Sequence, residues 1–229
     1  MNASAVVIWN TSIGKKAVMA VTGFILLGFV IGHMVGNLKV FQGEEKFNAY
    51  AVWLREVGRP AVGHGQFLGL ARLTLLTATV LHIVAAAQLT QMSYAARPVS
   101  YGRWKAVQAT YASLTMRWGG VIIALFVIYH ILHFTFGAVG YAPGQYRPMS
   151  VYRNVVMGFS VWYVSAFYIA AMLALGLHMY HGVWSMFHTL GVNDARVNRV
   201  YRAFATVSSL AVVLGNISVP VAVLTGLVR

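Results

Sequence analysis

Residues 15–40 read KKAVMAVTGFILLGFVIGHMVGNLKV, an apolar run with one histidine, His33, deep inside it. At about 1.5 Å per residue, such a run is long enough to cross the ~30 Å hydrocarbon core of a bilayer as a helix. Similar runs follow it, and we expect helices over 15–40, 67–95, 117–140, 156–188 and 202–228. The sequence therefore predicts an all-α integral membrane protein with five transmembrane helices in a bundle.

The composition agrees with a membrane setting and leaves room for one domain. Hydrophobic residues make up 59% of the chain and charged residues 9%, and the mean hydropathy is +0.69. A soluble domain carries far more charge, so we predict a single membrane-anchor domain over residues 1–229. The first apolar run is longer than the core of a secretion signal, and we expect it to be a retained helix.

Cysteine content and net charge restrict the chemistry of this chain. Without cysteine it cannot form a disulfide, a Cys-ligated iron–sulfur cluster or a c-type haem attachment. Any iron–sulfur or flavin chemistry must then belong to a partner. In a membrane protein, a net charge of +13 is suited to anionic headgroups, cofactor propionates or an acidic partner subunit. We predict no nucleic-acid binding.

Orientation and connections follow from short local signals. Lys15 and Lys16 directly precede the first run, which favours a cytoplasmic N-terminus, although basic residues are nearly balanced between the two sides. Residues 41–66 form the longest outer loop, and their apolar positions recur at helical spacing, which predicts an amphipathic helix in the interface. Residues 97–115 form a basic inner segment, and 141–153 a turn-rich outer one.

Each of the first four apolar runs carries a deeply placed histidine: His33, His82, His130 and His178, about 48 residues apart. An ionisable side chain in hydrocarbon costs several kcal/mol unless something satisfies it, so such residues are functional candidates. Neutral imidazoles from different helices can ligate metals in pairs, and this set suits two bis-histidine b-type haems in a helical bundle. The alternative is that each histidine only hydrogen-bonds a neighbouring helix.

Depth in the membrane sorts these four histidines into two pairs. Counted from the predicted helix ends, His33 and His130 lie about 20–25 Å above the inner interface, in the outer half. His82 and His178, on helices that run the other way, lie about 15–18 Å above it. We therefore predict an outer pair, His33 with His130, and an inner pair, His82 with His178. Two pairs at two depths are what transmembrane electron transfer needs.

Spacing alone leaves part of the ligand set open. His133 follows His130 by three residues, and His181 follows His178 by three, so the members of each couple lie on nearly the same helix face. The spacing does not decide which histidine of each couple would be the metal ligand.

Motifs in three of the runs resemble those of one family. They are SIGKK (12–16), MAVTG (19–23), HMVGNL (33–38), MRWGG (116–120), YHILHF (129–134), HMYHG (178–182), SMF (185–187) and TLG (189–191). Together they resemble the cytochrome b subunits of succinate dehydrogenase and fumarate reductase, of the single-chain, five-helix, di-haem type. The similarity covers nearly the whole chain, and the histidine of the second run matches mainly by its position.

The resemblance implies a ligand set and a function. His33 and His130 would bind the distal haem, and His82 and His178 the proximal one, in preference to the histidines three residues later. The chain would be the membrane anchor of a succinate:quinone oxidoreductase of the tricarboxylic acid cycle, in the bacterial cytoplasmic membrane. Electrons from succinate would pass from FAD on a flavoprotein subunit, through an iron–sulfur subunit, to both haems and then to menaquinone or ubiquinone. Both soluble subunits would dock on the cytoplasmic face, and succinate oxidation itself would lie on the flavoprotein.

Basic and aromatic residues near the helix ends are candidates to meet the haem propionates. The inner candidates are Lys15, Lys16, Arg117, Trp118 and His188, and the outer ones are Arg72 and His64. The alternative for each is an interfacial anchor or a solvated side chain. No Asp or Glu lies inside a predicted span, so we expect no carboxylate-based proton path through the bilayer. Glu56, in the first outer loop, is a candidate for an outer quinone site.

Two other classes of protein remain as alternatives. One is a di-haem b subunit that serves another quinone-linked enzyme, such as a formate dehydrogenase or a hydrogenase. The other is a haem-free scaffold or transporter whose histidines only bond across helices. Haem content distinguishes the haem-free scaffold or transporter from both di-haem proteins. The identity of the soluble partner then distinguishes a succinate enzyme from another quinone-linked enzyme.

Overall fold

The computed structural model describes residues 9–96, 111–189, 191 and 194–229, and over these residues every regular element is helical. The long helices are α2 (Ser12–Asn37), α4 (Gln66–Ala95), α5 (Tyr111–His130), α7 (Trp162–Thr189) and α8 (Ala195–Leu224). The short elements are α3 (Glu44–Glu56), α6 (Val151–Phe159), a 3-10 turn η1 (Leu38–Gln42) and a π-helical turn η2 (Ile131–Thr135).

Five of the described helices are long and apolar enough to cross a membrane, which confirms the predicted number. Large apolar side chains project from their middle turns into the surroundings, among them Phe24, Leu76, Leu125 and Leu214. Such exposed apolar belts would be unfavourable in water and are expected where lipid surrounds the helices. The chain is an all-helical integral membrane protein.

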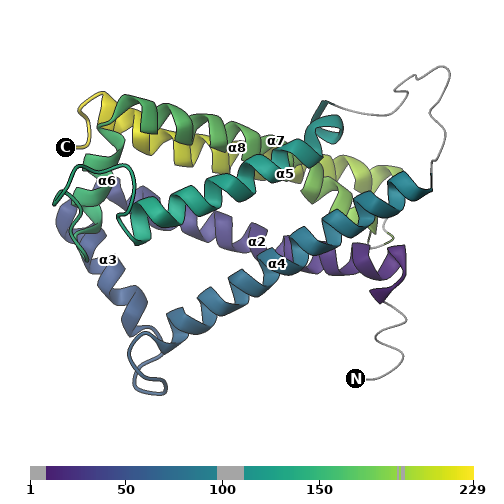
Figure 1. Ribbon diagram of the computed structural model, residues 1–229, viewed down its shortest axis with the longest axis horizontal. Coiled ribbons are helices and arrows are strands. Elements are labelled where there is room, and N and C mark those ends of the chain that lie inside the picture. Colours follow the sequence, from purple (N-terminus) through teal and green to yellow (C-terminus); the bar gives the residue numbers. More distant parts are fainter. Residues whose placement is uncertain (1–8, 97–110, 190, 192–193) are drawn as a thin grey trace.

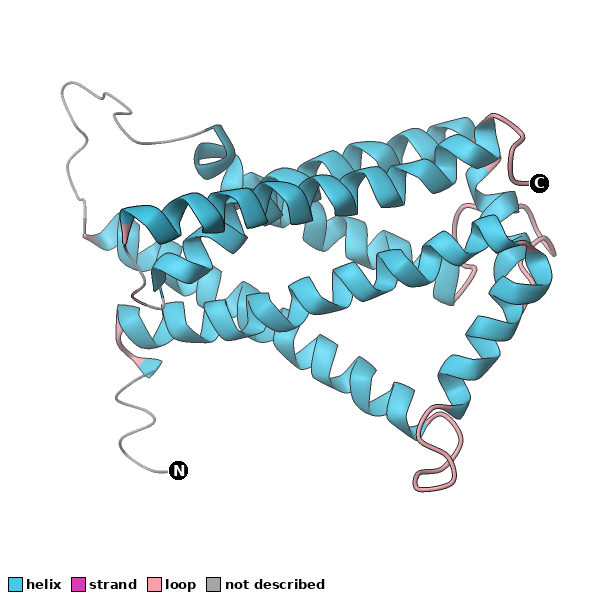
Figure 2. Ribbon diagram, turned by 180° about the vertical axis from the view of Figure 1, so that it is seen from behind, coloured by secondary structure: helices cyan, strands magenta, loops and turns pink. Residues whose placement is uncertain are grey.

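The long helices form two layers (Figure 1). α7 and α8 run side by side along their lengths, and α5 packs on α7. α2 contacts α7 and α8 and crosses α4, which packs chiefly on α2. Beyond this crossing α2 and α4 diverge, and α3 spans the distance between their outer ends (Figure 2).

Small residues permit the closest helix contacts. A Cβ atom on Gly176 of α7 would lie 2.5 Å from Val213 of α8, and one on Gly215 of α8 would lie 2.4 Å from the sulfur of Met34 of α2. Glycine at these positions lets the backbones approach, and van der Waals packing of this kind drives helix association in lipid. The α2, α7 and α8 helices are therefore fixed relative to one another.

Several predicted helix boundaries are wrong. The third span was expected to reach residue 140 but ends at Thr135 in the π-helical turn, and Gly137 then turns the chain with φ 62°. The expected fourth span, 156–188, is divided, because α6 ends at Phe159 and α7 begins at Trp162. The Ser165 hydroxyl donates to the carbonyl of Phe159 at 2.6 Å and satisfies one backbone group freed by this break. The fifth helix begins at 195 rather than 202.

The short helices α3 and α6 pack together at one end of the bundle. The amphipathic helix predicted within 41–66 is present as α3, with Phe47 and Ala51 buried against the protein. Asn48 of α3 accepts a hydrogen bond from the backbone N–H of Tyr152 in α6 at 3.0 Å. Most of the basic segment predicted at 97–115 lies outside the described residues. Its remaining part, 111–115, begins α5.

Candidate functional site

The structure brings the four predicted histidines together in two pairs. The ring centroids of His33 on α2 and His130 on α5 are 5.8 Å apart. Those of His82 on α4 and His178 on α7 are 6.4 Å apart. These are the two pairs that depth predicts. Both join the layer of α2 and α4 to the layer of α5 and α7.

The spacing within each pair fits two imidazoles on opposite sides of one metal ion. With a metal–nitrogen bond of about 2 Å and a nitrogen about 1.2 Å from the ring centre, axial imidazoles have centroids about 6–6.5 Å apart. The 6.4 Å of the His82/His178 pair lies within this range, and the 5.8 Å of the His33/His130 pair lies just below it. The ring planes meet at 89° and 61°, an edge-to-face arrangement that packed aromatic rings also adopt. The donor set therefore fits bis-histidine haem iron.

Glycine faces each histidine of the inner pair across a helix contact. A Cβ atom on Gly23 of α2 would lie 3.5 Å from His82 Cε1, and one on Gly120 of α5 would lie 3.6 Å from His178 Cε1. The two contacts are equivalent in the two layers. A Cβ at either position would be in ordinary van der Waals contact with the ring, so each glycine lies directly beside a ligand candidate.

Open space adjoins the histidine pairs. Among the described residues, no atom lies within 4 Å of a Cβ built on Gly28, Gly32 or Gly119. His33 is exposed and His130 is half-buried, although both lie in the middle of the helix bundle.

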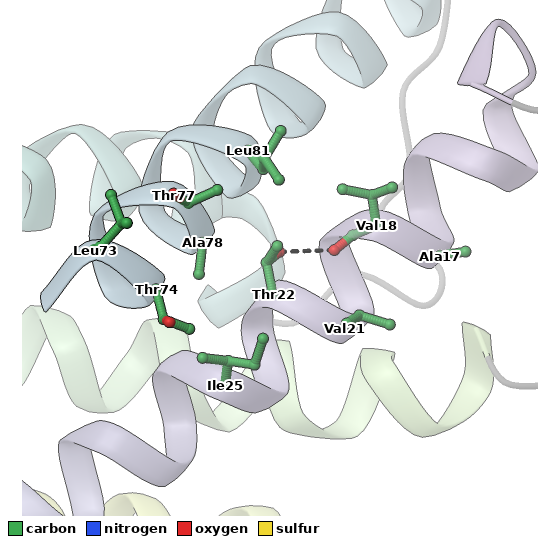
Figure 3. Close-up of a pocket in the computed structure, with 10 residues that line it drawn as sticks. All are labelled: Ala17, Val18, Val21, Thr22, Ile25, Leu73, Thr74, Thr77, Ala78 and Leu81. Carbon is green, nitrogen blue, oxygen red and sulfur yellow. Dashed lines mark hydrogen bonds between the residues drawn. The ribbon is translucent and has the colours of Figure 1, made fainter. Parts of the chain in front are cut away.

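A threonine determines which nitrogen of His82 is free to ligate. The Thr22 hydroxyl donates its only proton to the carbonyl of Val18 at 2.7 Å (Figure 3). Its oxygen therefore accepts from His82 Nδ1, 3.1 Å away. A neutral imidazole with its proton on Nδ1 presents the lone pair of Nε2, and we assign this tautomer to His82. Of the partner ring, the Nδ1 atom of His178 is buried and contacts no hydroxyl group of the described residues, and the ring lies beside the backbone of Met116.

This hydrogen bond lies in an apolar part of the membrane domain. Thr22 belongs to the wall of a cavity of about 620 Å³ between α2 and α4, whose other walls are mostly aliphatic (Figure 3). The Thr22 side chain itself is buried. A hydrogen bond in such surroundings is stronger than one in water, because the local dielectric constant is low.

A tyrosine lies behind the outer pair. The Tyr168 hydroxyl oxygen is 3.4 Å from His130 Nδ1 and 2.9 Å from His133 Nδ1. On the other side of the pair, the ring of Phe29 stacks on His33 with centroids 5.2 Å apart. The outer pair is thus held between an aromatic face on α2 and a phenol on α7.

The surroundings of His133 exclude it as a metal ligand and distinguish it from His130. Its ring is fully buried. A Cβ atom on Gly140 or Gly158 would lie 2.7 Å from its Nε2, so only glycine fits on either side. A ring enclosed in this way has no room for a metal on Nε2, and its Nδ1 is engaged by Tyr168. His181 is half-buried and contacts Trp184, with ring centroids 5.9 Å apart, while its neighbour His178 faces His82.

Two of the inner propionate candidates bond to neighbouring groups, and a third points away from the bundle. Lys15 is buried, and its Nζ donates to the carbonyl of Trp9 at 2.6 Å. Arg117 donates to the Tyr94 hydroxyl at 2.8 Å. Trp118 is 73% exposed and points away from the bundle.

Lys16 and His188 line one cavity of about 460 Å³ between the start of α2 and the end of α7, together with Ser185 and Thr189. His188 Nε2 also lies 3.3 Å from Asn198 Oδ1, so Lys16 is the basic side chain of this cavity that we consider for an anionic group.

The outer candidates lie apart from the histidine pairs. Arg72 is exposed on the first turns of α4. His64 Nδ1 lies 2.6 Å from Glu56 Oε1, and Arg59 donates to Glu56 Oε2 at 2.7 Å. Hydrogen bonds from Arg59 and then His64 hold the pKa of the exposed Glu56 carboxyl below its ordinary value. The three side chains form an ion cluster at the protein surface.

Comparisons with protein-family models, with curated proteins and with solved structures give no match for this chain. Sequence reasoning had missed Thr22 and Tyr168, and it had not singled out Gly23 and Gly120. Both glycines nevertheless fall within motifs noted above, MAVTG and MRWGG. A threonine hydroxyl in a membrane helix usually bonds its own helix backbone, so the sequence carries no signal that Thr22 contacts a histidine. The Tyr168 contacts join different helices and leave no local pattern.

Proposed function

We propose that this chain is the di-haem cytochrome b membrane anchor of a succinate:quinone oxidoreductase. The observation that carries the proposal is the presence of two histidine pairs at metal-ligand spacing, both between the same two helix layers. The family motifs that surround these histidines in the sequence supply the choice of enzyme. When bound, each haem b supplies a one-electron carrier inside the bilayer.

The four ligand residues have paired roles in this proposal. His33 and His130 bind the distal haem through neutral imidazoles, and His82 and His178 bind the proximal one. Each pair takes one ligand from each helix layer, so binding also holds α4 against α7 at one depth and α2 against α5 at the other. The apolar walls exclude water and provide a low dielectric medium around the iron.

Basic side chains at the inner end of the bundle neutralise the haem propionates in this proposal. We assign Lys16, which lines a cavity at this end of the bundle, to a propionate of the proximal haem. Lys15 and Arg117 already bond to Trp9 and Tyr94 and act as anchors. This end faces the cytoplasm in the proposed orientation, where the iron–sulfur subunit and the FAD-bearing flavoprotein dock. Menaquinone or ubiquinone accepts the electrons from the surrounding lipid of a bacterial cytoplasmic membrane.

Haem content of the detergent-purified protein tests the proposal. A pyridine haemochrome assay should give about two b haems per chain, as expected from four axial ligands. His82→Ala and His178→Ala should lose the same haem, and His33→Ala and His130→Ala the other. His181→Ala is the matched control, because it lies one helical turn from His178, and it should retain both. A haem-free wild-type protein would contradict the proposal and leave a protein whose histidines only pack.

The enzyme assignment needs a separate measurement. The haem-loaded chain should co-purify with a flavoprotein and an iron–sulfur protein, and the complex should reduce a quinone with succinate as donor. Two haems with a flavin-free partner and no succinate activity would instead identify the anchor of another quinone-linked enzyme.

A further inference from the structure

In each pair, one of the two histidines contacts a hydroxyl group. Thr22 contacts His82 of the inner pair, and Tyr168 contacts His130 of the outer pair. The other two ligand candidates, His33 and His178, have no such hydroxyl among the described contacts. The inference drawn from these contacts rests on the proposed function, because a hydroxyl group can change a reduction potential only if the histidine it contacts binds iron.

Thr22 can act on His82 in one direction only. Its proton is donated to its own helix backbone, to the carbonyls of Val18 at 2.7 Å and Met19 at 3.2 Å, so its oxygen accepts from His82 Nδ1. Accepting a hydrogen bond from the remote nitrogen increases the basicity of the ligating one. A more basic axial ligand stabilises ferric iron over ferrous iron, which lowers the reduction potential.

Tyr168 is directed by a second histidine. Its oxygen lies 2.9 Å from His133 Nδ1 and 3.4 Å from His130 Nδ1. If His130 ligates through Nε2, its Nδ1 carries a proton and can only donate to Tyr168. The phenol proton then goes to His133 Nδ1, which gives the order His130 N–H, Tyr168 O–H, His133 N.

The position of His133 explains why it suits this role. Gly140 and Gly158 leave its ring no freedom to turn, since a Cβ on either would lie 2.7 Å from Nε2. His133 therefore presents Nδ1 to Tyr168 at a fixed place. Without that acceptor, the phenol could donate to His130 Nδ1 and favour the wrong tautomer.

We propose that Thr22 and Tyr168 are positioning residues that each fix the tautomer of one axial histidine and lower the reduction potential of that haem alone. His133 is the group that orients Tyr168. The two potentials can thus be set independently by residues that touch neither iron nor substrate.

Redox titration of each haem tests this assignment. Thr22→Val removes the hydroxyl with little change in volume and should raise the potential of the His82/His178 haem only. Tyr168→Phe should raise that of the His33/His130 haem only. A tenfold change in the relative affinity for ferric and ferrous haem corresponds to about 59 mV for a one-electron couple. Thr22→Ser keeps the hydroxyl and should restore the wild-type value.

The outcomes separate this inference from the proposed function. Wild-type protein without haem would defeat the proposed function itself. Two haems whose potentials stay unchanged in both variants, or variants that shift the same haem, would overturn the inference alone. If Tyr168→Phe fails to assemble, His133→Leu removes the acceptor of the phenol proton and should raise the same outer potential. An unchanged outer potential in His133→Leu would overturn the Tyr168 assignment.

Discussion

Gly158→Ala should destabilise the protein through a clash with a side chain that cannot move. The new Cβ would lie 2.7 Å from His133 Nε2 and 3.2 Å from the Tyr141 hydroxyl. The His133 ring has no escape, because Gly140 closes its other edge and Tyr168 holds its Nδ1. Overpacking of a closed site costs about 1–3 kcal/mol.

Gly119→Ala is the matched control for this prediction. Both glycines are helical, so alanine brings each about the same gain in helix propensity, of about 1 kcal/mol. No atom of the described residues lies within 4 Å of a Cβ at Gly119, so that variant carries the gain without the clash. The difference between the two variants then isolates the clash.

The assay is thermal unfolding of both variants in the same detergent, followed by circular dichroism. For a chain of this size, 1 kcal/mol corresponds to about 2–4 °C in Tm, so Gly158→Ala should melt about 2–12 °C below Gly119→Ala. Equal melting temperatures would refute the reasoning, because they would mean that His133 can move within its enclosure.

Three further predictions concern the inner cavity, the surface cluster and α4. Lys16→Ala should lower the reduction potential of the inner haem and leave the outer one unchanged in redox titration, since it removes a positive charge beside the propionates. Contacts with Arg59 and His64 lower the carboxyl pKa of Glu56. These contacts should therefore stabilise the folded state at pH values above the ordinary carboxyl pKa. The stabilisation should disappear as the pH falls through the lowered pKa. Melting curves of E56Q should thus meet the wild type in acid and fall below it at neutral pH. Removal of haem should speed hydrogen exchange in α4 more than in α8, because α4 packs chiefly on α2.

The helices and the histidine pairs could be predicted from sequence for clear reasons. Hydropathy over about 20 residues reports a membrane span directly. Constant rise per residue converts a position such as His130 into a depth. The depths of four histidines were enough to pair them correctly, even though the end of the third helix was misplaced.

Other features depend on contacts that no local pattern encodes. The break at Ser160 separates α6 from α7 inside a run that is apolar throughout. The choice between His130 and His133 depends on Gly140 and Gly158, which lie in a loop and in another helix. The Tyr168 contact joins residues 35 and 38 positions apart in the chain, and no periodicity within one helix reports it.

The pairing of histidines by alternate spans has a consequence for biogenesis. The outer pair joins the first and third spans, whereas the inner pair joins the second and fourth. During synthesis the outer pair is therefore complete once His130 has entered the membrane, while His82 still awaits His178. At about 5–20 residues per second the ribosome needs roughly 2–10 s to make the residues between these two histidines. Under the proposed function, the His33/His130 pair would therefore be complete and able to bind haem before the His82/His178 pair.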